Sequence, residues 1–387
     1  MKKVLIIVLS NLKHDARVRR QVNALKRNYA TTVVCFDGDP SEEYELIAIK
    51  PTKLTFFRKS IASAFLLLRL HSIAYKILHD YSYVVQRLAD RRFDIVVAND
   101  VETLPLAFKF PGSPGVIFDA HEYAPRHFED RKMWRLFFQN FNTWLCKKYI
   151  PLTAAMITVG KGLAEEYERH FHVKPHVVTN ANNYVDLDPS PIIDNKIRLV
   201  HHGIATPSRK LELMIEMMRL LDDRFTLDLI LMVPGFASKK TRHYIDDLRG
   251  KIQSDARIKI VPPVQSSEVV ATVHKYDIGV FLIPPINFNY QNALPNKLFD
   301  FIQARLGVAI GPTPEMAQIV NEYNTGIVSE DFTAQSLAAK LNKLTKSEVE
   351  MYKRNSGEAA RDLNAEANAK KLNDILTAVL HQEKSSR

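Results

Sequence analysis

Cysteine and long apolar runs are both scarce in this chain. Only two of its 387 residues are cysteine, Cys35 and Cys146, and neither belongs to a CxxC pair or has a histidine pair nearby. This excludes a disulfide framework and a cysteine-based zinc site, and it favours a reducing compartment. The nearest approach to a membrane span, residues 61–68, ends at Arg69. A span needs roughly 20 uncharged residues, so we expect none.

The amino terminus has only part of the pattern of a secretory signal. Two lysines precede six apolar residues, 4–9, and polar residues follow from Asn11 onward. A signal core needs about 7–15 apolar residues and a small-residue cleavage site. We therefore expect a cytoplasmic protein, and peripheral attachment to the inner face of the cell membrane is a further hypothesis, argued below.

Composition is that of a folded globular protein, with 46% hydrophobic and 25% charged residues. At roughly 150 residues per domain, the length indicates two or three domains. The formal net charge of +10 is concentrated: residues 53–92 hold eight Lys/Arg against two acids, and residues 126–148 hold six against two. Both segments are also rich in aromatic residues, which fits either amphipathic helices with aromatic residues in the core or contact with anionic lipid. No nucleic-acid-binding motif is present, so we expect no nucleic-acid partner.

Short β-branched runs alternate with helix-like segments in two blocks. Unbroken apolar strands alternating with helices predict parallel sheets covered on both faces, so the fold class is α/β with two doubly wound, Rossmann-like domains in tandem. We expect an amino-terminal domain over 1–183, a linker over 184–196, a second domain over 197–363, and a last helix over 364–387 that crosses back to the first domain. Two such domains bind ligands in the cleft between them. The predicted strands are 4–9, 32–36, 94–98, 115–118, 156–159 and 177–179, then 197–201, 226–233, 258–261, 278–283 and 308–310.

The first predicted strand of the second domain leads into a basic turn. Gly203 follows the strand, Ser208 is a candidate N-cap, and Arg209 and Lys210 would occupy the first turn of the next helix. Cations are unfavourable at that end of a helix dipole, and a bound anion would remove the conflict. Helix-start amides and two cations can bind a diphosphate, although a solvated basic turn is the plainer interpretation.

A second candidate lies after residues 278–283. Pro295 suits the first helical position, and Lys297 and Asp300 follow one turn apart. A lysine near a helix start can reach a phosphate, and a carboxylate one turn later can accept two ribose hydroxyls. The alternative is a surface ion pair.

Polar residues also end three predicted strands of the first domain. His121 lies between Asp119 and Glu122, where carboxylates would either hold the imidazole protonated or fix its tautomer. Asp15 can cap a helix that carries Arg17. Capping or loop solvation is the alternative for each such residue. The third strand ends at Asn99 and Asp100.

Seven motifs follow one another along the chain: HDARVRRQVNALKR, FDIVVAND, FDAHE, ITVGKGLAEEY, VVTNANN, RKLELMIEMM and LPNKLFDFIQARLGVAI. In this order they resemble the motifs of family 4 glycosyltransferases of the GT-B fold. The resemblance implies a retaining, metal-independent transferase that needs no cofactor, uses a nucleotide-diphosphate sugar as donor, and binds the donor on the second domain and the acceptor on the first.

The resemblance assigns roles residue by residue. Arg209 and Lys210 match the basic pair at the donor diphosphate, and His121 matches the histidine aimed at the transferred sugar. Asp300 matches the ribose-binding second carboxylate of a Glu-seven residues-Glu signature, whose first carboxylate is replaced here by Asn292. The full donor set implied is Gly203, Arg209, Lys210, Asn292, Leu294, Lys297 and Asp300. The acceptor-side set is Asp15, Arg17, Asn99, Asp100, Asp119 and Glu122.

The function predicted is transfer of a sugar, with a UDP-sugar expected, to a hydroxyl of a lipid-linked or polysaccharide acceptor in cell-surface glycan synthesis. The family implies front-face attack in which fixed cations stabilise the leaving diphosphate. A same-fold sugar-nucleotide epimerase or hydrolase, and a non-catalytic nucleotide-sugar-binding partner suggested by Asn292, remain alternatives.

Residues 53–92 also predict a membrane contact. Taken as one continuous helix, the segment brings four cations to one face, beside an apolar stripe. A stripe that packs on the first domain is the alternative, and residues 126–148 are the next candidate. The cations are Arg58, Arg69, Lys76 and Arg87, and the stripe is Ile73, Ile77, Tyr81, Val84 and Leu88.

Overall fold

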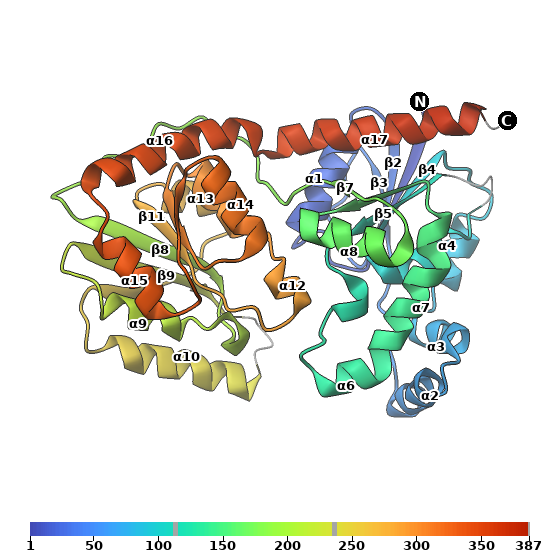
Figure 1. The fold of residues 1–387 in the computed structure, drawn as a ribbon. Helices are drawn as coiled ribbons and strands as arrows, with labels where there is room; N and C mark the ends of the chain where they lie inside the picture. Colours follow the sequence, from blue (N-terminus) through green and yellow to red (C-terminus); the bar gives the residue numbers. More distant parts are fainter. Residues whose placement is uncertain (111–114, 234–237, 386–387) are drawn as a thin grey trace. The chain divides into compact units, whose positions relative to one another are not determined.

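A computed structural model describes residues 1–110, 115–233 and 238–385 (Figure 1). The chain divides into two compact units. Unit 1 comprises Met1–Thr179, Asn287–Asn289 and the chain from Asn368 onward, and unit 2 comprises Asn180–Ile286 and Tyr290–Ala367. Unit 2 thus begins at Asn180, and the sequence had predicted the end of the first domain at residue 183.

Unit 1 is built on a parallel sheet with the strand order β3-β2-β1-β4-β5-β6-β7 among its described residues. Successive side chains of a strand point to opposite faces, so an unbroken apolar strand such as β1 is buried on both sides. The strands are β1 (Lys3–Ile7), β2 (Ala30–Cys35), β3 (Glu45–Ala48), β4 (Ile95–Asn99), β5 (Gly115–Ala120), β6 (Ala155–Thr158) and β7 (His176–Val177).

Helices cover both faces of this sheet. On one face, Val4 and Ile6 pack with α1 and with Leu372 and Leu376 of α17. On the other face, Leu5 packs in the cluster that holds α3, α4, α5, α7 and α8. The helices are α1 (Ala16–Leu25), α2 (Phe56–Leu67), α3 (His71–Leu78), α4 (Ser82–Arg87), α5 (Leu104–Ala107), α6 (Lys132–Trp134), α7 (Asn140–Tyr149), α8 (Lys161–Phe171) and α17 (Ala365–Ser385).

Unit 2 has a second parallel sheet, ordered β10-β9-β8-β11-β12-β13 in the described part of the chain. One face packs on α9, α10 and α15, and the other on α11, α13 and α14. The strands are β8 (Ile197–Ile204), β9 (Phe225–Met232), β10 (Ile258–Val261), β11 (Ile278–Phe281), β12 (Gly307–Ile310) and β13 (Gly326–Val328). The helices are α9 (Glu212–Met218), α10 (Lys239–Ile252), α11 (Val269–Val273), α13 (Asn296–Gln303), α14 (Pro314–Glu322), α15 (Ala334–Asn342) and α16 (Lys346–Asp362). The short helix α12 (Phe288–Gln291) has its first two residues in unit 1 and its last two in unit 2.

The predicted α/β class is confirmed, and each predicted strand overlaps an observed one. Two edge strands were missed. β3 and β13 are short and largely half-exposed, so they lack the apolar runs that identified the other strands. Residues 184–193 of the predicted linker form neither helix nor strand. Residues 386–387 of the predicted last helix lie outside the described residues.

The continuous helix predicted over residues 53–92 is wrong. The segment forms α2, α3 and α4, and the chain turns sharply at Arg69, whose φ is +58°. The four cations therefore do not share one helical face. Tyr81, Val84 and Leu88 are buried in the core, as the alternative interpretation stated. The aromatic residues Phe56 and Phe57, in contrast, are 87% and 72% exposed at the start of α2.

Candidate active site

Two neighbouring histidines lie near the carboxyl end of β8, the central strand of unit 2. The backbones of β8 and β11 pair only at Leu199 and Val200 of β8. One residue further along β8, the side chain of His201 contacts β11 instead. Nδ1 of His201 lies 2.9 Å from the carbonyl oxygen of Val280 in β11. The carboxyl ends of parallel strands are where open sheets bind ligands. The sequence analysis did not single out either histidine.

Lys297, in the first turn of α13, reaches the same place. Its Nζ lies 3.4 Å from Nε2 of His201 and 4.0 Å from the centroid of the Phe281 ring. The residue is only 8% exposed, and across the described residues no carboxylate oxygen lies within 4 Å of this amine. Burial and the nearby charge of Arg209 therefore lower the pKa of Lys297 well below its usual value. A buried amine without a carboxylate partner is a place where an anion would bind favourably.

Gly203 keeps the space beside this amine open. Its φ of +136° is rarely adopted by residues with a side chain. A Cβ atom at this position would lie 3.1 Å from Nζ of Lys297. The backbone conformation therefore favours glycine here, and a larger residue would also crowd the amine.

Asp300 lies one turn after Lys297 and is also buried. Its Oδ1 accepts a hydrogen bond from Nδ2 of Asn182 at 3.2 Å, and its Oδ2 lies 3.4 Å from Nε2 of His202. Burial and the charge of Lys297 lower the pKa of His202 to about 3, so this imidazole is neutral at pH 7. The alternative of a surface ion pair between Lys297 and Asp300 is wrong, because both residues are buried.

The turn after β8 differs from the prediction. Pro207–Arg209 form a 3₁₀ turn, and α9 begins only at Glu212 with Leu211 at its N-cap. Ser208 is therefore not the cap of α9, and the predicted first-turn positions of Arg209 and Lys210 are wrong. Pro207 begins this short turn and Lys210, in a left-handed conformation, ends it, so a regular α-helix cannot start here.

The two basic residues of this turn make different contacts. Arg209 places its guanidinium 5.3 Å from the centroid of the Tyr290 ring and helps to lower the pKa of Lys297. Lys210 has a φ of +51°, is half-exposed, and its Nζ lies 3.7 Å from a carboxylate oxygen of Glu212. Of the pair, Arg209 is the one that described interactions link to the Lys297 cluster.

The other predicted donor residues surround the start of α13. Asn292 is half-buried in the turn after α12, and Leu294 is in the core. Pro295 is the N-cap of α13, one position earlier than predicted. The structure thus brings Gly203, Arg209, Lys297 and their histidine neighbours together, while Leu294 packs in the core of unit 2.

A buried polar network joins α1 to the sheet of unit 1. Asp119 accepts hydrogen bonds from Arg17 and, at 2.9 Å, from Nε2 of Gln21. Nδ2 of Asn99 donates to the side-chain oxygen of Gln21 at 2.9 Å. Asp15 caps α1 as predicted, accepting from the Val18 amide. These contacts hold α1 against the sheet and leave other residues to line the nearby pocket.

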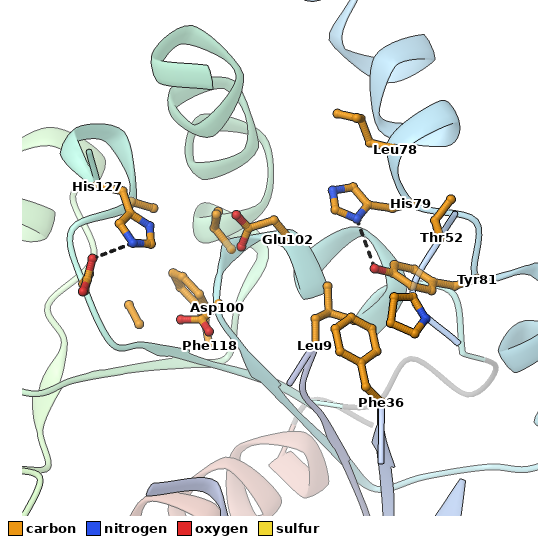
Figure 2. A pocket seen from close by; sticks show the side chains of 15 residues that line it. Leu9, Phe36, Thr52, Leu78, His79, Tyr81, Asp100, Glu102, Phe118 and His127 are labelled. Carbon is orange, nitrogen blue, oxygen red and sulfur yellow. Dashed lines mark hydrogen bonds and ion pairs between the residues drawn. The ribbon is translucent and has the colours of Figure 1, made fainter. Parts of the chain in front are cut away.

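That pocket, of about 450 Å³, opens at the carboxyl ends of β1, β4 and β5 (Figure 2). One wall is apolar and the other carries carboxylates and a histidine. Nε2 of His127 lies 2.8 Å from a Glu122 carboxylate oxygen, and Nδ1 of His79 lies 3.0 Å from the hydroxyl of Tyr81. Among its lining residues are Leu9, Phe36, Leu78, Phe118, Asp100, Glu102, Glu122 and His127. Asp100 and Glu122 were predicted, whereas Glu102 and His127 were not.

His121 lies at the rim of this polar network. Its Nδ1 is 3.6 Å from Oδ1 of Asp100, and its Nε2 is buried without a hydrogen-bond partner in the described structure. Burial and the charge of Arg17 lower the pKa of His121 to about 3. The imidazole is therefore neutral at pH 7, and the interpretation in which the carboxylates hold it protonated is wrong.

Among the residues that the structure describes, no group of three or more His, Cys, Asp or Glu side chains is placed to hold a metal ion. None of the described helices has both the length and the apolar character that a membrane span requires.

Comparisons with known proteins identify relatives by family and by fold. Residues 16–189 match the family described as Glycosyltransferase Family 4. Curated proteins gave no significant match. Sucrose-phosphate synthase from Thermosynechococcus elongatus is similar with a TM-score of 0.74 and 14% identity, over 99% of this chain and 100% of that one.

Two further solved structures are similar over nearly the full length. WaaG, a glycosyltransferase involved in lipopolysaccharide biosynthesis, has a TM-score of 0.66 and 14% identity, over 97% of this chain and 99% of that one. Anabaena HepE, solved with UDP and glucose, has a TM-score of 0.65 and 12% identity, over 97% and 100%.

The two parallel-sheet units and these likenesses define the class: the chain has the GT-B fold of glycosyltransferases. Within that fold, residues 16–189 are similar to glycosyltransferase family 4.

Proposed function

We propose that the protein transfers a sugar from a nucleotide-diphosphate sugar, with a UDP-sugar as the expected donor, to a hydroxyl of a lipid-linked or polysaccharide acceptor. The observation that carries this proposal is the buried amine of Lys297, which has no carboxylate partner within 4 Å among the described residues. It lies at the strand ends of unit 2 beside Gly203 and close to the charge of Arg209. A diphosphate would supply the missing negative charge.

The comparisons support a UDP-sugar. HepE was solved with UDP and glucose, and an Escherichia coli trehalose-6-phosphate protein was solved with UDP-2-fluoro glucose. In our proposal, Lys297 and Arg209 bind the diphosphate and stabilise the charge that develops as the glycosidic bond breaks. Asp300 binds the ribose. Transfer is retaining by front-face attack, and the cations make a metal unnecessary.

The pocket of unit 1 is the proposed acceptor site. Its acidic side chains can form hydrogen bonds with sugar hydroxyls, and burial raises the pKa of Asp100 to about 8, so this group can also donate at pH 7. The apolar wall of Leu9, Phe36 and Phe118 suits the less polar part of an amphipathic acceptor. His121 is neutral, so its role is to hydrogen-bond the transferred sugar rather than to supply charge.

Nucleotide binding is the first test. Titration calorimetry with UDP, GDP and ADP should detect binding of at least one nucleotide, and Lys297→Met should weaken it. Lys346→Met serves as the matched control, because Lys346 is a half-exposed lysine paired with Glu350 and has no assigned role in donor binding. Equal affinity in the wild type and Lys297→Met would contradict the donor site. Release of labelled UDP from a UDP-sugar only when acceptor is present would separate transfer from hydrolysis.

We also propose that the protein acts at the cytoplasmic face of the cell membrane, bound through α2 and α3. Residues 53–79 contain five Lys/Arg and no Asp or Glu. Large apolar side chains are exposed on the same segment, among them Phe56, Phe57, Leu68 and Ile73. A surface with exposed apolar side chains, neighbouring cations and no acidic residues is suited to an anionic bilayer. Each cation close to such a bilayer contributes roughly 1 kcal/mol to the free energy of binding.

Vesicle sedimentation tests this surface. The Phe56→Ser, Phe57→Ser double variant should bind phosphatidylglycerol vesicles at least about tenfold more weakly than the wild type. Leu152→Ser is the control, because Leu152 is 61% exposed in unit 1 but lies outside the basic segment. Binding should also fall at high salt and on phosphatidylcholine alone. Unchanged binding by the double variant would contradict the proposed surface.

A further inference from the structure

The hydrogen-bond partner of His201 determines its tautomer. The carbonyl oxygen of Val280, 2.9 Å from Nδ1, can only accept a hydrogen bond, so Nδ1 carries the proton. The ring is fully buried, and this burial, together with the nearby charges of Lys297 and Arg209, lowers the pKa of His201 well below its usual value. A neutral ring protonated at Nδ1 has its lone pair on Nε2. His201 therefore presents an acceptor on the side away from Val280.

That acceptor faces the amine of Lys297 at 3.4 Å. Lysine has only donors, so the polarity of the contact is fixed: the amine donates and Nε2 accepts. The ring of Phe281 lies 4.0 Å from Nζ and stacks near His201, and Gly203 leaves the remaining side open. A long flexible side chain is thereby confined to one position.

We propose that His201 is a positioning residue, which accepts a hydrogen bond from Lys297 and holds its amine at the open side next to Gly203, where the donor diphosphate binds. The inference rests on the proposed function for the identity of the anion. It goes beyond that function by assigning a role to a residue with no direct ligand contact. Without this contact the side chain of Lys297 would sample several rotamers in the free protein. Ordering it on donor binding would then cost conformational entropy and weaken the affinity.

Two substitutions test the contributions of the two nitrogen atoms of His201 separately. In His201→Asn, the side-chain amide can still donate to Val280 but cannot reach Lys297. In His201→Gln, the longer side chain can offer its oxygen to Lys297, while the bond to Val280 is lost. A purely structural histidine would tolerate asparagine better, because its fixed bond is the one to Val280. A positioning residue would tolerate glutamine better.

The first measurement is UDP affinity by calorimetry, with thermal unfolding recorded for each variant. We expect His201→Asn to weaken binding about tenfold and His201→Gln to stay within about threefold of the wild type, the scale of one hydrogen bond. The reverse order, or equal loss in both variants in proportion to lost stability, would overturn the proposal. So would wild-type affinity in both.

The second measurement needs no nucleotide. The pH dependence of Lys297 acylation is followed by mass spectrometry, with Lys353 as an internal control because it is a buried lysine bonded to Asp277 at 2.8 Å. Loss of the acceptor should move the Lys297 midpoint about one pH unit lower in His201→Asn, and should not move that of Lys353. An unmoved Lys297 midpoint overturns the proposal. If the wild type binds no nucleotide, the proposed function fails, and this experiment still decides the role of His201.

Discussion

Replacing Lys297 by methionine should weaken nucleotide binding and stabilise the fold. Methionine keeps most of the apolar side-chain length against Phe281 and removes only the amine. A hydrogen bond from a charged group to a phosphate contributes about 1.5–3 kcal/mol, so nucleoside diphosphate affinity should fall about 10- to 100-fold. Burying a polar group without a matching partner costs about 1–3 kcal/mol. Removing this amine should therefore raise the free energy of unfolding by about 1–2 kcal/mol at pH 7.

The gain in stability should depend on pH. The folded-state pKa of Lys297 lies well below its unfolded value near 10.4, so between these two values the unfolded chain binds more protons at this position. The free energy of unfolding of the wild type then rises with pH across this window, as far as this group is concerned. The advantage of Lys297→Met should be largest at neutral pH and shrink as the pH approaches 10.

The assay pairs urea unfolding at pH 7 and pH 9.5 with calorimetric titration of UDP. Lys346→Met controls for loss of an exposed positive charge outside the proposed site. A Lys297→Met variant that is less stable than the wild type at pH 7 would show that the amine is a structural element, and would refute the reasoning. So would a variant that retains wild-type UDP affinity.

Three further predictions follow from the same geometry. Arg209→Ala should lower transfer by about 100-fold, whereas Lys210→Ala should lower it less than about fivefold, in a steady-state assay; equal losses would show that both face the diphosphate. His121→Ala should abolish transfer and leave UDP affinity unchanged in calorimetry, because His121 is in unit 1. Asp277→Ala should cost about 3–5 kcal/mol in urea unfolding, because it removes the carboxylate that balances the buried charge of Lys353; a cost below about 1 kcal/mol would contradict that pairing.

The strands of both units were predictable because they are buried on both faces. A run such as Val4, Leu5, Ile6 and Ile7 has almost no exposed side chain, so hydrophobicity alone identifies it. The same argument fails for β3 and β13, two edge strands that are largely half-exposed and carry no continuous apolar signal.

Strand ends also gave the approximate position of the candidate site, because residues that follow parallel strands gather at one edge of a sheet. The local conformation there was not predictable. Sequence spacing placed Arg209 and Lys210 on a helix, but the left-handed backbone of Lys210 separates their side chains. No helical periodicity describes a 3₁₀ turn of three residues.

His201 was missed for a different reason. Its role depends on Val280, 79 residues away, and on Lys297, 96 residues away. The pairing of β8 with β11 decides which carbonyl oxygen meets Nδ1, and that bond in turn decides which nitrogen can accept from the lysine. A single sequence contains neither the register nor the tautomer.

Two buried charged residues in unit 2, Asp277 and Lys297, differ in whether the fold itself supplies a counter-charge. At the amino end of β11, Asp277 is fully buried and bonded to both Arg198 and Lys353, so its charge is balanced within the fold. At the carboxyl end of the same sheet, Lys297 is buried with a neutral histidine as its hydrogen-bond partner. A fold selected only for stability would replace such an amine with an apolar side chain, because desolvating it without a carboxylate is costly. The charge of Lys297 therefore lacks a counter-charge that a ligand anion would supply. The charge of Asp277 is already neutralised by Arg198 and Lys353, so that site needs no ligand.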